Sequence, residues 1–296
     1  MQKIRLAIVT VRNFECCDLY KVTQTQIRNQ GLNMTVNKIY VEDIIIQHNI
    51  VPGLIIDDEN IIDKYDVFLF RIDLKKNLNK IYVVARILKN SNKLIINTIF
   101  ATGNTFSDKL SIIPILQKLN LNHPKTLFID SKKILQQQLG KIDLPFIAKD
   151  PYGWQGEDIF LIKTFTDAQN LLNNFPHKGL IIQKYLQIDY DIRVIVIGFK
   201  ALGAIKRTNP KDDFRSNLSL GGNAKQIQLT KELREISERI AKHTQSEMLG
   251  IDFFLYNNKI YVNEIETCPG FNGFKKATNI SPLSKLLQYI IQKSNL

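Results

Sequence analysis

Cysteine is scarce in this sequence, which has three cysteines among 296 residues. Cys16 and Cys17 are adjacent, an arrangement that suits neither a disulfide framework nor the spaced ligands of a zinc site. Apolar runs of membrane-spanning length are also lacking, and the N-terminal apolar stretch is too short and too interrupted for a secretory signal. These absences exclude a disulfide-stapled secreted fold and a membrane-spanning chain, so we expect a protein of the cytoplasm.

Clusters of basic residues and internal repeats are lacking too. The formal net charge is +12, from 40 basic and 28 acidic residues, but no short window holds five or six basic residues. A nucleic-acid-binding arm is therefore not expected, and the charge favours another anionic partner such as a nucleotide or an acidic peptide. The alternative is compositional, because a general richness in Lys, Asn and Ile raises the charge without forming a binding patch.

What the sequence does contain is an alternation of short β-rich runs with helical patterns. The composition, 44% hydrophobic and 23% charged, is typical of a globular protein with a buried core, and the length allows more than one domain. In the first hundred residues the patterns predict helices at 18–31 and 79–88 and strands at 6–11, 33–40, 66–72 and 93–98. This alternation indicates an open α/β sheet.

The rest of the chain is richer in strands. Residues 107–120 are predicted to form a helix with Ser107 as its N-cap, and residues 231–245 form a second helical pattern. Strands are expected around a glycine loop in 145–162, in 179–186, and in two hairpins at 191–208 and 250–266. The expected fold class is therefore α/β and α+β.

Three carboxylates in the last hairpin raise the question of a metal site. Glu264 and Glu266 are two positions apart on a strand, so they share a face, and Asp252 lies on the preceding strand. A two-residue loop at Asn257 and Asn258 would set Glu264 on the face opposite to Asp252, whereas a three-residue loop would set them against each other. The metal interpretation therefore requires an odd loop, and the alternative is a solvated edge strand.

Oxygen ligands of this kind suit magnesium, which commonly takes one or two carboxylates together with substrate phosphates. Lys149 ends a strand just before Gly153 and Gly156, where backbone amides could approach phosphate oxygens. Arg207 and Arg215 follow in a basic segment and could hold a phosphate or a carboxylate. Taken singly, a glycine loop after a lysine is more often a simple β-turn, and the alternative for the basic segment is a solvated loop.

Together the motifs resemble a known family. DIRVIVIG, IKR, DFRSNLSLGG, GIDFF and NEIETCPGFNGF occur in the order and spacing of the ATP-grasp carboxylate–amine ligases of the RimK type. The similarity is dense from residue 191 to 280 and looser from 97 to 185. The resemblance implies an ATP-grasp fold with an N-terminal open α/β (pre-ATP-grasp) domain at 1–98, a small or lid subdomain at 99–186 and a C-terminal catalytic subdomain at 187–296.

The resemblance also implies roles for individual residues. Lys109 and Lys149 would reach the nucleotide phosphates, beside a phosphate loop that contains Gly153 and Gly156. Further nucleotide-binding positions are those of the adenine hinge, the ribose contact and a later loop: Lys184, Tyr185, Asp191, Arg215, Ser216 and Asn217. Residues that would act on the reacting groups are Arg207, Arg215 and Asn217. The magnesium ligands would be Asp252, Glu264 and Glu266.

The sequence departs from the family pattern at several of these positions. Glu266 stands where asparagine is usual, Lys184 replaces an acidic residue in the hinge, and Asp158 replaces a glycine of the phosphate loop. Leu220 occupies a position where some relatives have arginine, which leaves the amine substrate open.

The implied activity is that of an ADP-forming acid–amino-acid ligase that uses ATP and Mg²⁺, with Mn²⁺ as an alternative. It would form an amide through an acyl phosphate, adding glutamate or a similar amino acid to a peptide or protein. The alternatives are a ligase for a small molecule or a carrier protein, and a nucleotide-binding module with weakened catalysis. The acceptor and a homo-oligomeric state stay open.

Overall fold

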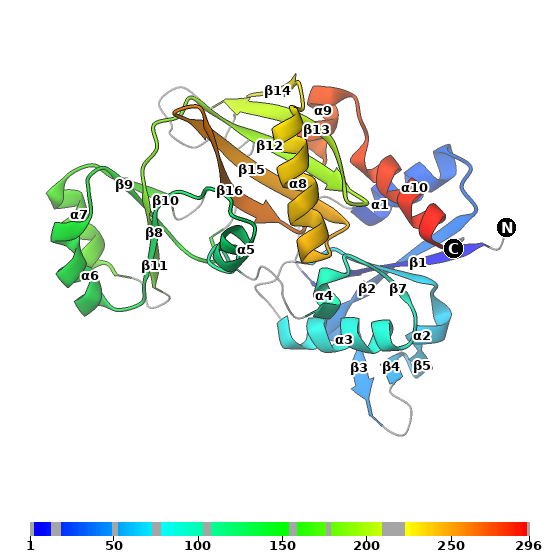
Figure 1. Cartoon of the computed structure of the whole chain (residues 1–296). Coiled ribbons are helices and arrows are strands. Elements are labelled where there is room, and N and C mark those ends of the chain that lie inside the picture. The colour runs from blue at the N-terminus through cyan, green and yellow to red at the C-terminus, as the bar shows by residue number, and fades with distance from the viewer. Residues whose placement is uncertain are drawn as a thin grey trace.

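The chain is described here by a computed structural model. It describes residues 3–12, 19–48, 53–72, 78–102, 108–153, 159–175, 179–208 and 223–294. Figure 1 shows a central five-stranded sheet, with an antiparallel sheet and two helices at one end and a parallel sheet on the other side.

The parallel sheet has the strand order β2-β1-β6-β7 and forms as expected near the N-terminus. Its strands are β1 (Ile4–Thr10), β2 (Met34–Tyr40), β6 (Val67–Phe70) and β7 (Leu94–Ile96). Its main helices are α1 (Leu19–Asn29) and α3 (Leu78–Asn90). β1 and β6 are buried along nearly their whole length, which is why their sequences are continuous apolar runs rather than alternating ones.

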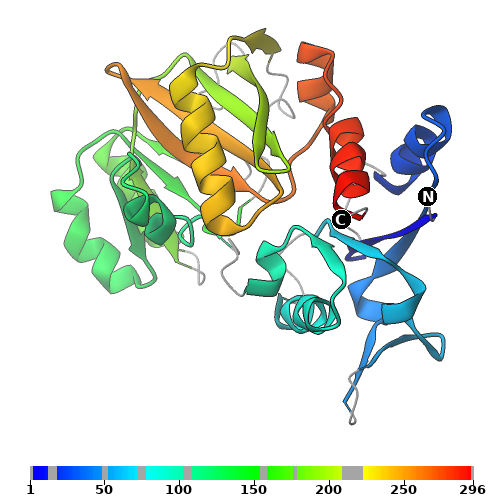
Figure 2. The same cartoon turned by 45° about the vertical axis from the view of Figure 1, so that its right-hand side comes forward.

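A small three-stranded antiparallel sheet extends from the parallel sheet, as Figure 2 shows. It consists of β3 (Ile45–Gln47), β4 (Gly53–Ile56) and β5 (Glu59–Asn60) and lies between the short helices η1 (Val41–Asp43) and α2 (Ile61–Lys64). No element was expected here, because strands of two to four residues are too short to show a period of two.

The second four-stranded sheet is antiparallel and has the order β10-β9-β11-β8. Its strands are β8 (Thr126–Ile129), β9 (Phe146–Lys149), β10 (Ile159–Ile162) and β11 (Leu180–Lys184), and its helices are α6 (Lys132–Gln138), η2 (Leu139–Lys141) and α7 (Phe165–Asn173). One face packs on these helices through a cluster that includes Leu135, Phe146 and Leu172. The other face therefore remains available for polar side chains.

The helix expected at residues 107–120 is shorter than predicted, because α5 covers only Ile113–Lys118. The Asp108 carboxylate accepts hydrogen bonds from the backbone N–H groups of Leu110 and Ser111, at 2.7 and 2.8 Å. This aspartate turn bends the chain before the helix begins, and a proline in the first helical turn then fixes the start. The predicted N-cap Ser107 lies outside the described residues.

The central sheet has the order β14-β13-β12-β15-β16 and is antiparallel throughout. Its strands are β12 (Tyr190–Ile197), β13 (Lys200–Thr208), β14 (Asn223–Ile227), β15 (Met248–Tyr256) and β16 (Lys259–Glu266). Helix α8 (Lys231–Thr244) packs on one face, as the pattern at 231–245 predicted. Helices α9 (Asn272–Thr278) and α10 (Pro282–Ser294) pack on the opposite face.

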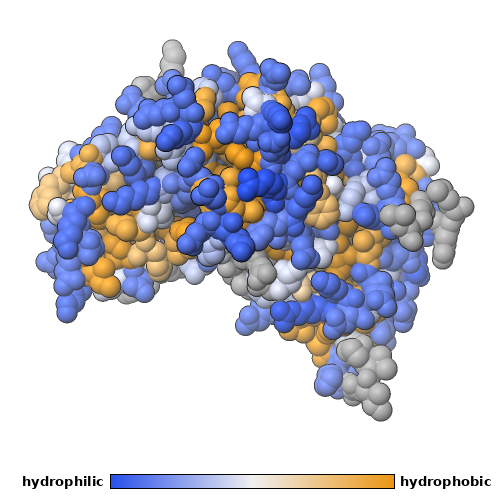
Figure 3. All heavy atoms as spheres, viewed as in Figure 1, coloured by the Kyte–Doolittle hydropathy of each residue, from blue (hydrophilic) through white to orange (hydrophobic). Residues whose placement is uncertain are grey.

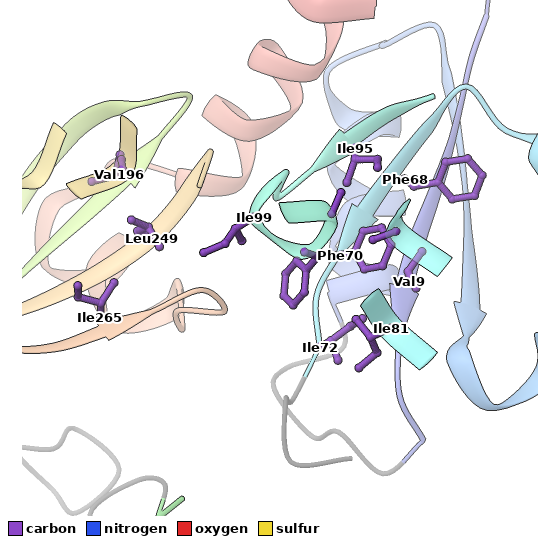
Figure 4. Packing of buried hydrophobic residues seen from close by; sticks show 14 of the residues in the cluster. Val9, Phe68, Phe70, Ile72, Ile81, Ile95, Ile99, Val196, Leu249 and Ile265 are labelled. Atoms are coloured by element: carbon purple, nitrogen blue, oxygen red, sulfur yellow. The ribbon is translucent and has the colours of Figure 1, made fainter. Parts of the chain in front are cut away.

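The central and parallel sheets share a continuous buried cluster. Figure 4 shows Ile99, on the short helix α4 (Ile99–Thr102), between Leu249 of the central sheet and Phe70 of the parallel sheet. Hydrophilic residues cover much of the face drawn in Figure 3, with smaller hydrophobic areas beside α8 and near α6 and α7. Among the described residues, none of the helices combines the length and apolarity needed to cross a membrane.

Candidate active site

The hairpin of β15 and β16 brings the three carboxylates together, but not through the expected odd loop. The turn has two residues, Asn257 and Asn258, both with positive φ (50° and 56°), as a tight hairpin turn of the I′ type requires. The register then shifts at Asn263, which is an extra residue between the pairs Phe253↔Val262 and Asp252↔Glu264. This β-bulge, rather than the loop, sets Asp252 opposite Glu264.

The bulge decides which face the glutamates occupy. Val262 packs in the cluster under α8, and in a regular strand Glu264 would point the same way. Because Asn263 is inserted, Glu264 and Glu266 turn to the other face. One carboxylate oxygen from each of Asp252, Glu264 and Glu266 lies within 4.8 Å of the others.

Two buried arginines neutralise much of this acidic cluster. Arg193 lies directly opposite Asp252 on β12 and donates to both of its carboxylate oxygens at 2.7 Å, and to Glu266 at 2.8 Å. Arg207 on β13 donates to both oxygens of Asp191 at 2.6 Å and to Asp252 at 2.8 Å. The planar guanidinium groups match carboxylates bidentately, so each fixes the position of the acid that it faces.

The arginines shift the pKa of the acids unequally. Burial alone would raise the pKa of Asp252, but Arg193 and Arg207 outweigh it and lower that pKa. Burial raises the pKa of Glu266, where the single contact with Arg193 is opposed by the charges of Asp252 and Glu264. Asp252 is therefore ionised. Glu266 is more easily protonated than Asp252 unless a further cation lies beside it.

These residues fit a divalent cation. A carboxylate offers about four lone-pair positions, so the arginine contacts leave acceptor capacity on Asp252 and Glu266. Among the described residues, the cation nearest to Glu264 is Lys109, whose Nζ lies 3.7 Å from Glu264 Oε1. A set of oxygen ligands with net negative charge is what Mg²⁺ or Mn²⁺ prefers.

Two lysines approach the carboxylates from other parts of the chain. Lys109 lies beyond α4, and its Nζ donates to the carbonyl of Gly153 in the loop after β9. Lys149, the last residue of β9, is 7% exposed. Burial lowers the pKa of Lys149 to about 8, with Glu264 opposing the shift and Lys109 adding to it. The amines supply positive charge next to the acids, as a phosphate site requires.

A chain of hydrogen bonds orients Lys149. Its Nζ donates to Gln183 Oε1 at 2.9 Å, and Gln183 Nε2 donates to Thr126 Oγ1 at 3.0 Å. Thr126 in turn donates its hydroxyl proton to the carbonyl of Pro124 at 2.7 Å. Because the threonine proton is used in this way, its oxygen must accept from the amide, which turns the glutamine oxygen toward the lysine.

Three of the remaining predicted nucleotide contacts, Lys184, Tyr185 and Asp191, belong to the described residues. Lys184 ends β11 with an exposed side chain, and its backbone N–H donates to the carbonyl of Lys125 at 2.9 Å. Tyr185 follows it and is half-buried. Asp191 is 3% exposed and holds Arg207 through both oxygens. In this structure, Asp191 therefore supports Arg207, and its contact with a ribose stays a prediction.

Several predicted residues lie outside the described part of the chain. They are Gly156, Arg215, Ser216 and Asn217, together with the departures at Asp158 and Leu220.

Sequence reasoning missed Arg193 and Gln183. Arg193 is two positions after Asp191, so on a strand both share the face that carries the site. That alternation was a usable signal. Gln183 carried no comparable signal, because its role depends on a cross-sheet contact with Lys149.

A cavity of about 450 Å³ lies elsewhere. It is beside α8 and is lined partly by Glu232, Glu235 and Arg239. Val262 and Ile236 also line it, which places it on the α8 face of the central sheet, opposite to the three carboxylates. The candidate site is thus distinct from this cavity.

Comparison with known proteins agrees with the resemblance in the motifs. Residues 106–290 match the model of the RimK-like ATP-grasp domain. The glutamate–LysW ligase ArgX of Sulfurisphaera tokodaii is 32% identical over 195 residues, covering 63% of this chain and 69% of that protein. A protein of Legionella pneumophila named "Probable alpha-L-glutamate ligase" is 30% identical over 192 residues, covering 63% of this chain and 64% of that protein. The matches thus span about two thirds of these relatives' length.

Solved structures share the fold over nearly the whole chain. The ATP-grasp ligase PsnB in complex with a minimal precursor has a TM-score of 0.73 at 14% identity, covering 97% of this chain and 98% of that one. D-alanine–D-alanine ligase of Bacillus anthracis in complex with ATP has a TM-score of 0.68 at 16% identity, covering 100% of this chain and 98% of that one. The expected ATP-grasp fold is thereby confirmed.

Proposed function

Because the chain belongs to the RimK-like ATP-grasp ligase family, we propose that it is an ATP-dependent ligase that adds glutamate, or a similar amino acid, to a peptide or protein. The observation that carries the proposal is the meeting of Asp252, Glu264 and Glu266 with Lys109 and Lys149, which come from separate parts of the chain. Such a meeting of acids and amines suits a polyphosphate bound with a divalent cation.

In the proposed reaction, a substrate carboxylate attacks the γ-phosphorus of ATP and gives an acyl phosphate and ADP. An amine then attacks the acyl carbon, and phosphate leaves as the amide forms. A bound magnesium ion would neutralise charge on the phosphoryl oxygens. Asp252, Glu264 and Glu266 would hold that ion, while Lys109 and Lys149 bind phosphate oxygens. Arg207, Arg215 and Asn217 are the proposed residues at the reacting groups.

Arginine positioning supports this assignment. Arg193 and Arg207 are held rigidly by acids that are themselves buried, so neither needs to reorganise when charge develops nearby. No protein nucleophile is needed, since positioning and charge stabilisation account for phosphoryl transfer.

Two relatives favour a macromolecular acceptor. The name of one couples glutamate to LysW, and a solved neighbour, PsnB, is complexed with a precursor peptide. The positive charge of this chain would help to recruit an acidic acceptor of either kind. A carrier-protein ligase is therefore the second candidate within the same chemistry.

The first experiment measures ADP release with Mg²⁺, glutamate and a panel of acidic peptides, with product masses as the second readout. Amino-acid-dependent ADP release and a mass gain of whole residues on an acceptor are expected. Tight nucleotide binding without release under every condition would instead indicate the module with weakened catalysis.

A variant tests the site itself. Glu264→Ala should reduce amino-acid-dependent ADP formation by about 100-fold or more, because it removes one of the three carboxylates proposed to hold the magnesium ion. The matched control is Glu235→Ala, which removes an exposed glutamate of α8 on the other side of the central sheet. Circular dichroism and thermal midpoints check that both variants fold. Preserved turnover in folded Glu264→Ala would contradict the assignment.

A further inference from the structure

Buried polar side chains of the parallel sheet reach into the end of the hairpin that carries the carboxylates. Asn97 follows β7 and is fully buried, and Arg71 follows β6 and is 2% exposed. Neither residue was singled out by the sequence patterns. Buried polar groups persist only where hydrogen bonds compensate their desolvation, so their partners show what they hold.

Asn97 joins the two strands of the hairpin at their open end. Its Nδ2 donates to the carbonyls of Met248 and Thr267, both at 3.0 Å, and its Oδ1 accepts from the Met248 N–H at 2.6 Å. Met248 is the first residue of β15, and Thr267 directly follows Glu266, the last residue of β16. One side chain thus fixes the distance between the two strand ends.

The turn after Glu266 is held on two further sides. Arg71 donates to the carbonyl of Pro269 at 2.7 Å and lies 4.9 Å from the ring centre of Phe271. Gly250, which pairs with Glu266 across the hairpin, is so close to Pro269 that a Cβ would lie 2.7 Å from the proline side chain. The backbone that follows Glu266 therefore has little freedom.

We propose that Asn97 is a positioning residue for Glu266, through which docking of the parallel sheet shapes the cation site. The inference rests on the proposed function, since it takes Glu266 as a cation ligand. Glu266 is held by the single arginine contact to Arg193 and has a partly exposed side chain, so its placement depends on the backbone next to it. Asn97 supplies that restraint from a sheet formed some 150 residues earlier in the chain.

A merely structural role predicts something different, and Thr98 provides the matched control. Its hydroxyl donates to Glu247 Oε1 at 2.5 Å, so it links the same end of β7 to the residue just before Met248. Unlike Asn97, Thr98 makes no hydrogen bond to the chain after Glu266 within the part of the chain that the structure describes. Thr98→Val should therefore weaken the docking of the two sheets without releasing Glu266.

The experiment measures binding of Mn²⁺ in the presence of ADP by electron paramagnetic resonance, and binding of ADP without metal by calorimetry. Asn97→Leu and Asn97→Asp remove the bonds to both carbonyls, and each should weaken Mn²⁺ binding at least about tenfold. Binding of ADP without metal should stay within about twofold of the wild type in the same variants. Thr98→Val should keep the wild-type affinities for Mn²⁺ and for ADP, even if its thermal midpoint falls as much as those of the Asn97 variants.

Arg71 keeps the proposal testable if Asn97→Leu and Asn97→Asp do not fold. Arg71→Lys retains a cationic donor toward Pro269, whereas Arg71→Met does not, so only the second should weaken Mn²⁺ binding. Equal Mn²⁺ affinity in the Asn97 variants and Thr98→Val, or in the two Arg71 variants, would overturn the inference. A wild-type protein that binds no Mn²⁺ with ADP would instead overturn the proposed function.

Discussion

At the scale of single residues, the acids of the site differ in how they are held. Asp252 receives hydrogen bonds from two arginines, Glu266 from one, and Glu264 faces a lysine at 3.7 Å. The attraction within a buried ion pair is largely offset by the cost of desolvating both charges. The arginines therefore contribute more to the placement of the acids than to net stability. Asp252 and Glu266 are thus held in place by arginines, whereas Glu264 faces Lys109.

Glu266→Asn tests the extra charge at the third position. The amide keeps an oxygen ligand but loses a negative charge, so the Mn²⁺ concentration for half-maximal activity should rise by about tenfold while the maximal rate is largely kept. Activity titrations with Mg²⁺ and Mn²⁺ check this expectation. A folded variant with no activity at saturating metal would show that Glu266 has another task.

The proposed phosphate-binding role of Lys149 predicts that nucleotide binding depends on pH. Its pKa is about 8 in the free protein, mainly through burial, and phosphate oxygens nearby should raise it toward the ordinary value. ADP binding should therefore take up a proton, with an uptake of about 0.1 proton at pH 7 that rises to about 0.9 at pH 9.

Calorimetry in buffers of different ionisation enthalpy measures this uptake. The control is Lys21→Met, which removes a lysine of α1 on the parallel sheet and should leave the uptake unchanged. An uptake that does not rise between pH 7 and pH 9 would exclude Lys149 as the phosphate-binding amine.

At the scale of secondary-structure elements, the sequence predicted strands and helices better than their registers. The apolar runs of β1 and β6 and the helical pattern of α8 follow from periodicities that local sequence carries. The bulge at Asn263 does not follow from local sequence, because an inserted residue is recognised only from the residue pairs on either side of it. For the same reason the requirement of an odd loop for the metal interpretation was wrong, because the bulge aligns the three acids with a two-residue loop.

Deleting Asn263 tests the account of the bulge. Removal of the inserted residue restores regular alternation, in which Glu264 and Glu266 still lie on the face of Asp252. We therefore expect the deletion to retain Mn²⁺ binding in the presence of ADP within about threefold, whereas Glu264→Ala loses it. Loss of binding in a folded deletion variant would mean that the twist of the bulge, and not only the face, is required.

At the scale of the whole molecule, the candidate site is assembled from parts that are distant in the sequence. The central sheet supplies the acids and arginines, the second sheet supplies Lys149, and the parallel sheet fixes the hairpin end through Asn97. Contacts over such separations leave no local pattern, which is why the resemblance to a family located the acids and Arg207 but not Gln183 and Asn97.

Glu247 gives the docking of the two sheets a pH dependence. Its carboxylate is 5% exposed and accepts from the backbone N–H and the hydroxyl of Thr98, at 2.7 and 2.5 Å. Burial raises the pKa of Glu247, and the bonds from Thr98 only partly offset this. Since the folded pKa exceeds the unfolded one, folding favours the protonated acid, and that contribution is lost as the pH rises through the folded pKa.

Glu247→Gln should remove the loss of stability at high pH, because the amide does not ionise. It should keep both contacts with Thr98, because the amide oxygen can accept from the Thr98 N–H and the amide nitrogen can donate to the Thr98 hydroxyl. The variant should have a higher thermal midpoint than the wild type at about pH 8, and the difference should vanish at about pH 3, where the acid is protonated in both states. Calorimetric melting across this range measures it, with Glu235→Gln as the control for an exposed glutamate. Equal midpoints of Glu247→Gln and the wild type at pH 8 would contradict this expectation. They would mean that a nearby positive charge, such as that of Lys293, compensates the buried carboxylate.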